Sequence, residues 1–298
     1  MRTLLLATLF AAAPALAGPR VVVIQSDTLD AYTEPVPAFI DTLDEPVQVV
    51  NLNGRRAEAD ATMERLRRDP PDAVFALGAK AAWSVAQNLP DTPLVYASVL
   101  EPTRYGLSGN QVTGVSATVE PGLFLSQFTG FFPEVGRIGI IRGPSGDSER
   151  HQAMVDAADA VGVSLVTVEV TSPREARKAL ASLSEQVDGL WLQPDRETLD
   201  ASTFRYFTEE SRRRGLPLLV ETQNMVAAGA LFAVIPDADG VGAQAAEMIR
   251  RILAGAAPAI LPVESPDKTQ VVLSLRAARL AEVDVDPLLL DFVDVVVE

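Results

Sequence analysis

The sequence has no cysteine and a single histidine, and both shortages remove kinds of chemistry. Without cysteine the chain can form no disulfide, no thiolate metal site and no cysteine-linked lipid anchor. The lone His151 lies in a helical stretch beside Arg150 and Gln152 and reads as a solvated surface residue. With no cysteine nucleophile or serine elbow to serve, it supports no catalytic triad. The sequence predicts a protein that is not an enzyme and is stabilised by its hydrophobic core alone.

Positive charge and glycine-rich loops are also scarce. The 25 Lys and Arg residues are outnumbered by 40 Asp and Glu residues, which gives a net charge of −15 at pH 7. So acidic a chain repels the phosphate backbone, and nucleic acid is excluded as a partner. No glycine-rich loop is followed by lysine and serine or threonine, so a P-loop is absent. Asp237-x-Asp239 and Asp284-x-Asp286 lack the further ligands of a calcium loop, and we expect neither metal nor cofactor.

Residues 1–17 have the pattern of an export signal. Arg2 precedes an apolar stretch over residues 4–13, and Ala15 and Ala17 supply the small side chains at positions −3 and −1 of a cleavage site. The alternative is a membrane anchor, but the stretch is shorter than the roughly 20 residues that cross a bilayer. We expect cleavage before Gly18 and a periplasmic protein.

Short apolar runs alternate with segments of helical period along the rest of the chain. Runs without polar residues are typical of strands covered on both faces of a parallel sheet. The first set lies at residues 21–24, 47–50, 73–77 and 94–97, and a second set of strands is expected at 138–141, 165–170, 189–192, 218–220 and 231–235. Helices are expected between them, at 57–68, 151–160, 174–183 and 198–214. Two such sets predict two α/β lobes with doubly wound sheets.

Proline and glycine mark the expected lobe boundaries. Residues 131–136 interrupt a helical pattern just before a strand, so lobe 1 is expected over 18–136 and lobe 2 over 137–236. A second crossing is expected near Pro236, followed by a helix to about Leu253 that periodicity alone fits to either lobe. We assign residues 237–265 to lobe 1 as a returning segment. Residues 266–298 are placed with lobe 2, but the sequence leaves lobe 1 open as the alternative for them.

Gly240-x-Gly242-x-x-Ala245 fits two interpretations. It matches a dinucleotide-binding fingerprint, but it lies late in the chain and not at a first strand-to-helix turn. Close packing of the helix is therefore the favoured reason for these small residues. Of the two tryptophans, Trp191 falls inside a strand and is expected in the core, and Trp83 is expected to support a nearby loop.

The order and spacing of several segments resemble ABC transporter substrate-binding proteins of the tryptophan/tyrosine type. The segments are 74–82, 113–116, 194–195, 226–230 and 240–242, and the resemblance covers residues from about 21 to about 280. It implies a type I periplasmic-binding fold, in which two Rossmann-like lobes with parallel sheets are joined by a multi-strand hinge. It also implies that a small solute binds between the lobes.

Carried over by position, the resemblance implies a set of ligand-binding residues. Lobe 1 would offer backbone N–H groups and hydroxyls to a carboxylate, and lobe 2 a carboxylate to an ammonium group. Asp195 has a plain alternative role as a loop or N-cap aspartate after Pro194. The implied residues are Gly78, Ala79, Lys80, Ser98, Glu101, Thr113 and Ser116 in lobe 1, and Ser148, Asp195, Arg196, Glu221 and Thr222 in lobe 2.

Three positions depart from the family pattern. Arg196 stands where relatives carry asparagine, Glu101 precedes Pro102 where they carry aspartate, and Arg142-Gly143-Pro144 replaces an aromatic-Asn-Pro loop. Two inward-pointing guanidinium groups would favour an anionic ligand, because arginine binds carboxylates bidentately. The alternative, which we favour slightly, places both arginines in solvent at the rim.

The sequence thus predicts a monomeric protein that captures an amino acid or related small anion for the permease of an ABC importer. A ligand sensor that signals to a membrane kinase would use the same cleft. An exported α/β hydrolase has little support because its catalytic groups are missing. Closure of the lobes around the ligand would create the docking surface for the membrane partner.

Overall fold

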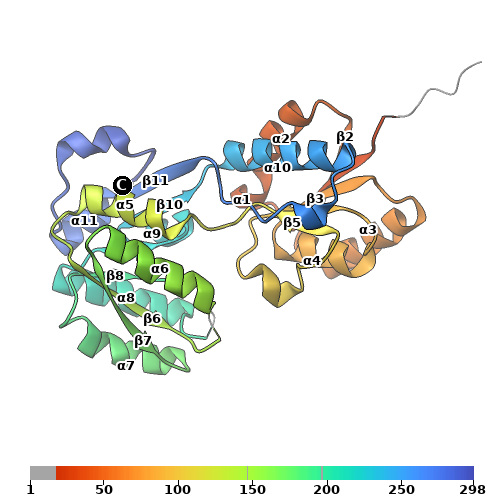
Figure 1. Cartoon of the computed structure of the whole chain (residues 1–298). Helices are drawn as coiled ribbons and strands as arrows, with labels where there is room; N and C mark the ends of the chain where they lie inside the picture. The colour runs from red at the N-terminus through yellow and green to blue at the C-terminus, as the bar shows by residue number, and fades with distance from the viewer. Residues whose placement is uncertain (1–17, 146, 196) are drawn as a thin grey trace, which may run out of the picture.

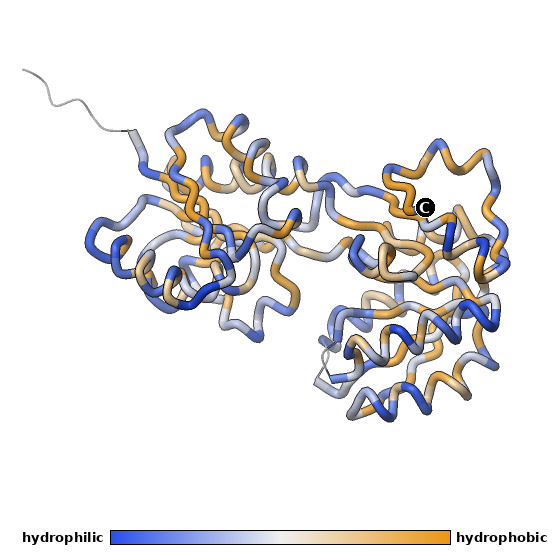
Figure 2. Tube along the Cα trace, turned by 180° about the vertical axis from the view of Figure 1, so that it is seen from behind, coloured by the Kyte–Doolittle hydropathy of each residue, from blue (hydrophilic) through white to orange (hydrophobic). Residues whose placement is uncertain are grey.

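The computed structural model describes residues 18–145, 147–195 and 197–298, which form two lobes joined by a narrow waist (Figure 1). The expected export signal lies outside the described residues. Hydrophobic segments run through the interior of each lobe and hydrophilic ones along the outer helices (Figure 2). No helix in the described part of the chain is both long and apolar enough to cross a membrane.

Lobe 1 is built on a five-stranded parallel sheet, which contains the four predicted strands and a fifth, β5, that the sequence analysis did not predict. The strand order is β2-β1-β3-β4-β5. Three of the predicted runs are buried along their whole length, but β2 is partly exposed because it lies at the edge of the sheet. The prediction that residues 47–50 are covered on both faces was therefore wrong. The strands are β1 (Val21–Gln25), β2 (Val47–Asn51), β3 (Ala73–Leu77), β4 (Leu94–Ala97) and β5 (Val112–Gly114).

Helices cover both faces of this sheet. Helices α2 and α10 pack on one face and α3 and α4 on the other, each pair with its own hydrophobic cluster. The returning helix α10 therefore belongs to lobe 1. The elements are α1 (Asp30–Thr33), α2 (Pro35–Leu43), α3 (Arg56–Arg68), α4 (Ala79–Asn88) and α10 (Ala238–Leu253), with short 3-10 turns at Pro102–Tyr105 and Pro258–Ile260.

The packing interpretation of Gly242 is confirmed by the contact between α10 and α2. A Cβ atom on Gly242 would lie 2.1 Å from the carbonyl oxygen of Pro35 and 3.0 Å from the backbone nitrogen of Phe39. Real Cβ atoms do not approach backbone atoms so closely, so only glycine lets the two helix backbones meet here.

Lobe 2 contains a seven-stranded sheet of order β12-β11-β10-β9-β8-β6-β7. It is parallel except where β11 pairs antiparallel with β10, a departure from the wholly parallel sheet that was expected. The C-terminal stretch supplies β12, which pairs parallel with β11. The strands are β6 (Arg137–Arg142), β7 (Ser164–Glu169), β8 (Gly189–Trp191), β9 (Leu218–Val220), β10 (Phe232–Pro236), β11 (Thr269–Ser274) and β12 (Val295–Val297).

The chain leaves lobe 1 earlier than the boundary expected at residue 136. Helix α5 carries Phe124, which stacks on Trp191 of β8 with ring centroids 4.5 Å apart. Its Phe128 and Phe131 meet Phe232 of β10, and all belong to one core cluster of lobe 2. Trp191 is 1% exposed, which confirms its core position. The helices of lobe 2 are α5 (Pro121–Phe131), α6 (Ser148–Ala160), α7 (Pro173–Leu183), α8 (Ala201–Arg214), α9 (Gln223–Ala227) and α11 (Leu275–Ala281), with a 3-10 helix at Pro287–Phe292.

Three segments cross between the lobes, and hydrogen bonds tie them together. The first crossing follows β5, the second joins β10 to α10, and the third runs from about residue 264 to β11. The Ser116 N–H donates to the carbonyl of Glu264 at 2.8 Å, and the Ser265 hydroxyl donates to Glu120 Oε1 at 2.5 Å. The Asp237 N–H donates to the carbonyl of Lys268 at 2.9 Å.

Candidate functional site

The carboxyl ends of the lobe 1 strands meet at one edge of the sheet. Helix α1, which follows β1, lies at this edge on the side turned toward lobe 2 (Figure 1). Loops at such an edge collect polar groups and helix N-termini, and ligands of open α/β sheets bind there. The edge therefore holds the first half of a candidate binding site.

Gly78 shapes this edge. It connects β3 to α4 with φ of 87°, and a Cβ atom there would lie 2.7 Å from both Ser26 Oγ and the ring of Tyr32. Ser26 in turn accepts a hydrogen bond from the backbone N–H of Ala81 at 2.9 Å, which holds the first turn of α4 against the end of β1. A glycine is required because the left-handed conformation and the close approach both exclude a side chain.

Lys80 and Ser98 lie at the same edge. The exposed ammonium group of Lys80 donates to the carbonyl of Gly54, in the loop after β2. Ser98 follows β4 with φ of 56°, an unusual value for a residue other than glycine, and its hydroxyl donates to the carbonyl of Ala31 at 2.9 Å. The structure thus brings together Gly78, Ala79, Lys80 and Ser98, as the resemblance implied.

Four polar residues of this edge were missed by the sequence analysis: Ser26, Asp27, Tyr32 and Asn51. Asn51 donates through Nδ2 to Gln25 Oε1 at 3.3 Å and to the carbonyl of Asp27 at 3.0 Å. Burial, and then the charge of Asp27, raise the pKa of the Tyr32 hydroxyl, so it stays protonated and able to donate. A usable signal existed, because Ser26, Asp27 and Asn51 stand where the apolar runs of β1 and β2 end.

Thr113, Ser116 and Glu101 each use the side chain in a contact within the protein. Thr113 is 1% exposed and its hydroxyl donates to the carbonyl of Leu261, which fastens the returning segment to β5. The hydroxyl of Ser116 bonds to Thr118 within the first crossing. The exposed Glu101 pairs with Arg104 at 3.3 Å. The side chains of Thr113 and Ser116 therefore serve the fold and the first crossing, and Glu101 makes a local ion pair in the loop after β4.

Asp195 of lobe 2 is occupied by the backbone. Its Oδ2 accepts from the Gly143 N–H at 2.7 Å and its Oδ1 from the Glu197 N–H at 2.8 Å. The first bond holds the loop after β6 to the loop after β8, and the second forms a turn within the loop after β8. The geometry favours the alternative role of Asp195 as a loop aspartate, because both oxygens are already engaged.

Two arginines lie at the lobe 2 edge, and both have carboxylate neighbours. Arg142 is 7% exposed and lies 3.9 Å from Glu169, so the expectation that it is solvated at the rim was wrong. Glu221, which follows β9, is 5% exposed and pairs with Arg150 of α6 at 2.9 Å. Arg196 lies outside the described residues. The edge therefore offers both a cation and a carboxylate.

The remaining predicted residues of lobe 2 lie at helix starts. Ser148 is the exposed first residue of α6, and Thr222 caps α9 by accepting from the Met225 N–H at 3.4 Å. His151 is half-buried and lies 3.4 Å from the Thr167 hydroxyl, so it is not the solvated residue that was expected. Burial, and then the charge of Arg142, lower its pKa, which leaves it neutral at pH 7.

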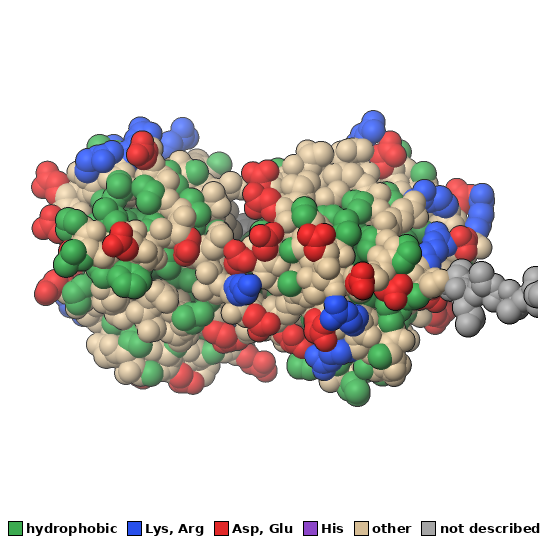
Figure 3. Space-filling model, turned by 90° about the horizontal axis from the view of Figure 1, so that it is seen from above, with side chains coloured by type: hydrophobic (Ala, Val, Ile, Leu, Met, Phe, Trp, Pro, Cys, Tyr) green, Lys and Arg blue, Asp and Glu red, His purple; other side chains and the backbone are tan. Residues whose placement is uncertain are grey.

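The two edges face each other across the waist. The start of α6 and the loops around α1 approach this space from opposite sides in Figure 1, and the surface is notched between the lobes in Figure 3. Among the described residues of the two edges, no nucleophile has an adjacent base. The polar groups that these edges carry can hold a polar solute from two sides.

Comparison with known proteins identifies the family. A family described as ABC transporter substrate binding protein matches residues 40–296. The chain belongs to this family. It is a substrate-binding protein and not an enzyme. Among curated proteins, none matches the sequence.

Solved structures of other substrate-binding proteins share the fold at low sequence identity. A ligand-free, open structure of a substrate-binding protein with adhesive properties from Clostridium difficile is 19% identical, with a TM-score of 0.75 over 94% of this chain and 99% of that one. An ABC domain in complex with L-Trp from Streptococcus pneumoniae is 22% identical, with a TM-score of 0.64 over the same shares. An ABC transporter solute-binding protein from Agrobacterium vitis with bound allitol is 14% identical, with a TM-score of 0.52 over 90% of this chain and 99% of that one. The fold is of the type I periplasmic-binding kind.

Proposed function

We propose that this substrate-binding protein is the periplasmic receptor of an ABC importer and that its solute is an amino acid or a related small carboxylate. The observation that carries the proposal is the pair of polar strand edges that face each other across a three-segment waist. Residues 1–17 would direct export and be removed.

The chemistry of the two edges supports a ligand with a carboxylate. Lobe 1 contributes the amino end of α4 and the Lys80 ammonium group, which has donors left beside its bond to the Gly54 carbonyl. Positive helix ends and ammonium groups favour an anion. Lobe 2 contributes the Arg150 and Glu221 pair, which can meet a second polar group of either sign. An amino acid carries both groups, so it can be held from both sides.

The lobes would bind by closing. The higher TM-score to the neighbour described as open and ligand-free, 0.75 against 0.64 for the one with L-Trp, supports an open arrangement of this chain. A solute that contacts both edges would shift the open state toward a closed one, because only the closed state makes both sets of contacts. The closed surface would then dock on the permease.

A thermal-shift screen of the mature protein against amino acids, small carboxylates and nucleosides tests the proposal. A true solute at a hundred times its Kd should stabilise the protein by about 2.7 kcal/mol. Lys80→Met should weaken the hit by about tenfold, since one charge-assisted hydrogen bond is lost. Lys178→Met, on the exposed surface of α7, is the matched control and should bind normally.

Two outcomes would refute the proposed site. One is a screen in which no small polar solute stabilises the protein. The other is a solute whose affinity is the same in Lys80→Met and Arg150→Gln as in the unchanged protein. Uptake of the solute into cells that lack this protein, restored by adding it back, then separates an importer from a sensor, because a sensor would restore signalling without transport.

A further inference from the structure

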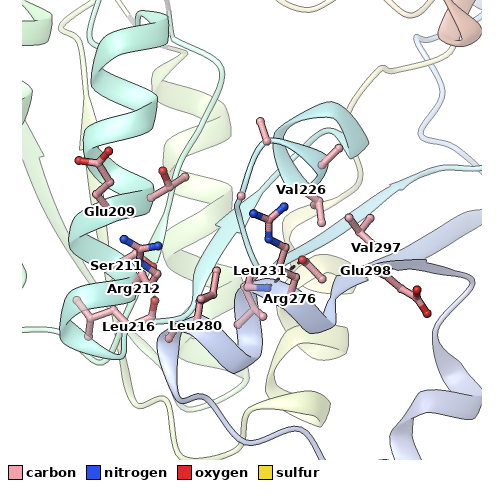
Figure 4. A pocket seen from close by; sticks show the side chains of 17 residues that line it. Glu209, Ser211, Arg212, Leu216, Val226, Leu231, Arg276, Leu280, Val297 and Glu298 are labelled. Carbon is pink, nitrogen blue, oxygen red and sulfur yellow. Dashed lines mark hydrogen bonds between the residues drawn. The ribbon is translucent and has the colours of Figure 1, made fainter.

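A cavity of about 220 Å³ lies in lobe 2, away from the interlobe face. Helices α8, α9 and α11 and the end of β12 surround it (Figure 4). It lies where β9 and β10 begin, and the interlobe face lies where these parallel strands end. Strand β11 runs antiparallel to β10, so its end and the following α11 also reach the cavity. The cavity is thus separate from the site proposed above.

The inner wall of the cavity is apolar. Leu216, Val226 and Leu231 line it and are at most 7% exposed, and Leu280 of α11, which is 48% exposed, lines it as well. The nearby polar groups of Ser211 and Ser274 are already used, since Ser211 Oγ donates to the carbonyl of Leu216 and Ser274 Oγ accepts from the Ala277 N–H. An aliphatic group can therefore enter without leaving a buried polar atom unpaired.

Two arginines flank the cavity. Arg212 comes from α8 and Arg276 from α11, and Figure 4 shows them on opposite sides of Leu280. Both are exposed, and no ion pair or side-chain hydrogen bond joins either of them to another described residue. Two carboxylates also line the cavity, Glu209 of α8 and Glu298 of the C-terminal stretch. The carboxylate of Glu298 points away from Arg276 (Figure 4), and neither acid forms an ion pair with Arg212 or Arg276 among the described residues. Two guanidinium groups without an ion-pair partner thus stand beside an apolar wall, in a chain with a net charge of −15.

We propose that this cavity is a second binding site, for a small aliphatic carboxylate. The carboxylate would bind between Arg212 and Arg276, because guanidinium groups bind planar carboxylates bidentately. The aliphatic chain would cover Leu231 and Leu280. The cavity is smaller than the roughly 300–1,000 Å³ of drug-sized sites, so the ligand is a short chain and not a large lipid.

Isothermal titration of the mature protein with sodium hexanoate tests the site, with hexan-1-ol and sodium chloride as controls. Saturable binding of hexanoate is expected, with the alcohol and the salt much weaker. Arg212→Gln and Arg276→Gln should each weaken hexanoate by about tenfold, the loss expected for one charge-assisted contact. Arg279→Gln is the matched control, because Arg279 is exposed on the same helix outside the cavity wall.

Ala277→Leu tests the same site without changing charge. Ala277 lines the cavity, so a larger side chain should fill the space and abolish binding. Absence of saturable hexanoate binding would overturn the proposal, and so would binding that survives Arg276→Gln or is equally reduced by Arg279→Gln. Loss of hexanoate binding in Lys80→Met would place the ligand between the lobes and also refute the second site. Because Lys80 and Arg276 lie in different lobes, failure here leaves the proposed receptor function untouched.

Discussion

Gly242 offers a direct test of how the returning helix is held against lobe 1. In Gly242→Ala the new methyl group would lie 2.1 Å from the carbonyl oxygen of Pro35 and 3.0 Å from the nitrogen of Phe39. Both are backbone atoms of α2, so the helices must separate. Overpacking of this kind costs about 3 kcal/mol, and alanine recovers about 1 kcal/mol of helix propensity. The free energy of unfolding should therefore fall by about 2 kcal/mol, and Tm by roughly 4–8 °C.

Gly130→Ala is the matched control for this change. Gly130 lies inside α5, and a Cβ atom there would meet nothing within 4 Å. The substitution should raise stability by about 0.5–1 kcal/mol, since only the backbone entropy of the unfolded chain changes. Thermal unfolding followed by circular dichroism measures both variants. Equal Tm values for Gly242→Ala and the unchanged protein would show that α10 and α2 do not meet as described.

Three further predictions concern lobe 2. Phe124→Ala should lower the free energy of unfolding by about 3–5 kcal/mol in a denaturant titration, because α5 anchors in this core, whereas Leu123→Ala on its exposed side should have little effect. Glu221→Gln should cost about 2–3 kcal/mol in the same titration, because it leaves Arg150 partly buried without its carboxylate. Asp200 has its pKa lowered from 3.8 to about 2, chiefly by the bond from the backbone of its helix. The Asp200 carboxylate therefore stabilises the folded protein fully above pH 3.8, and this stabilisation is lost as the pH falls toward 2. The difference in Tm between the unchanged protein and Asp200→Asn should shrink over the same range of pH.

Much of the fold could be predicted because buried parallel strands carry their own signal. The runs at 73–77 and 94–97 contain no charged residue, and the structure buries them on both faces. The same signal failed at β2, because an apolar run does not reveal whether a second neighbouring strand exists. The sequence analysis also expected no strand at Thr269–Ser274, where β11 pairs antiparallel with β10, because strand pairing depends on contacts between distant segments and not on local composition alone.

The lobe boundary failed for a similar reason. Proline and glycine at 133–136 do end α5, but they do not tell which core the helix enters. That choice depends on the stacking of Phe124 on Trp191, two residues that are 67 positions apart in the sequence. The candidate site was also only partly predictable. The position of Gly78 at a strand end could be read from the sequence. The hydrogen bond from the Gly143 N–H to Asp195 could not, because it depends on how two loops pack against each other.

The crossings decide how the lobes can move. The first and third are bonded through Ser265 and Glu120, and Gln270 of the third donates to Asp237 of the second at 2.9 Å. The three crossings are thus tied to one another, and each lobe has its own hydrophobic clusters. Packed cores resist deformation, so the proposed closure would concentrate its backbone changes in these crossings. The two polar edges would then approach as rigid surfaces, and under the proposal the solute that fits is the one that matches both at once.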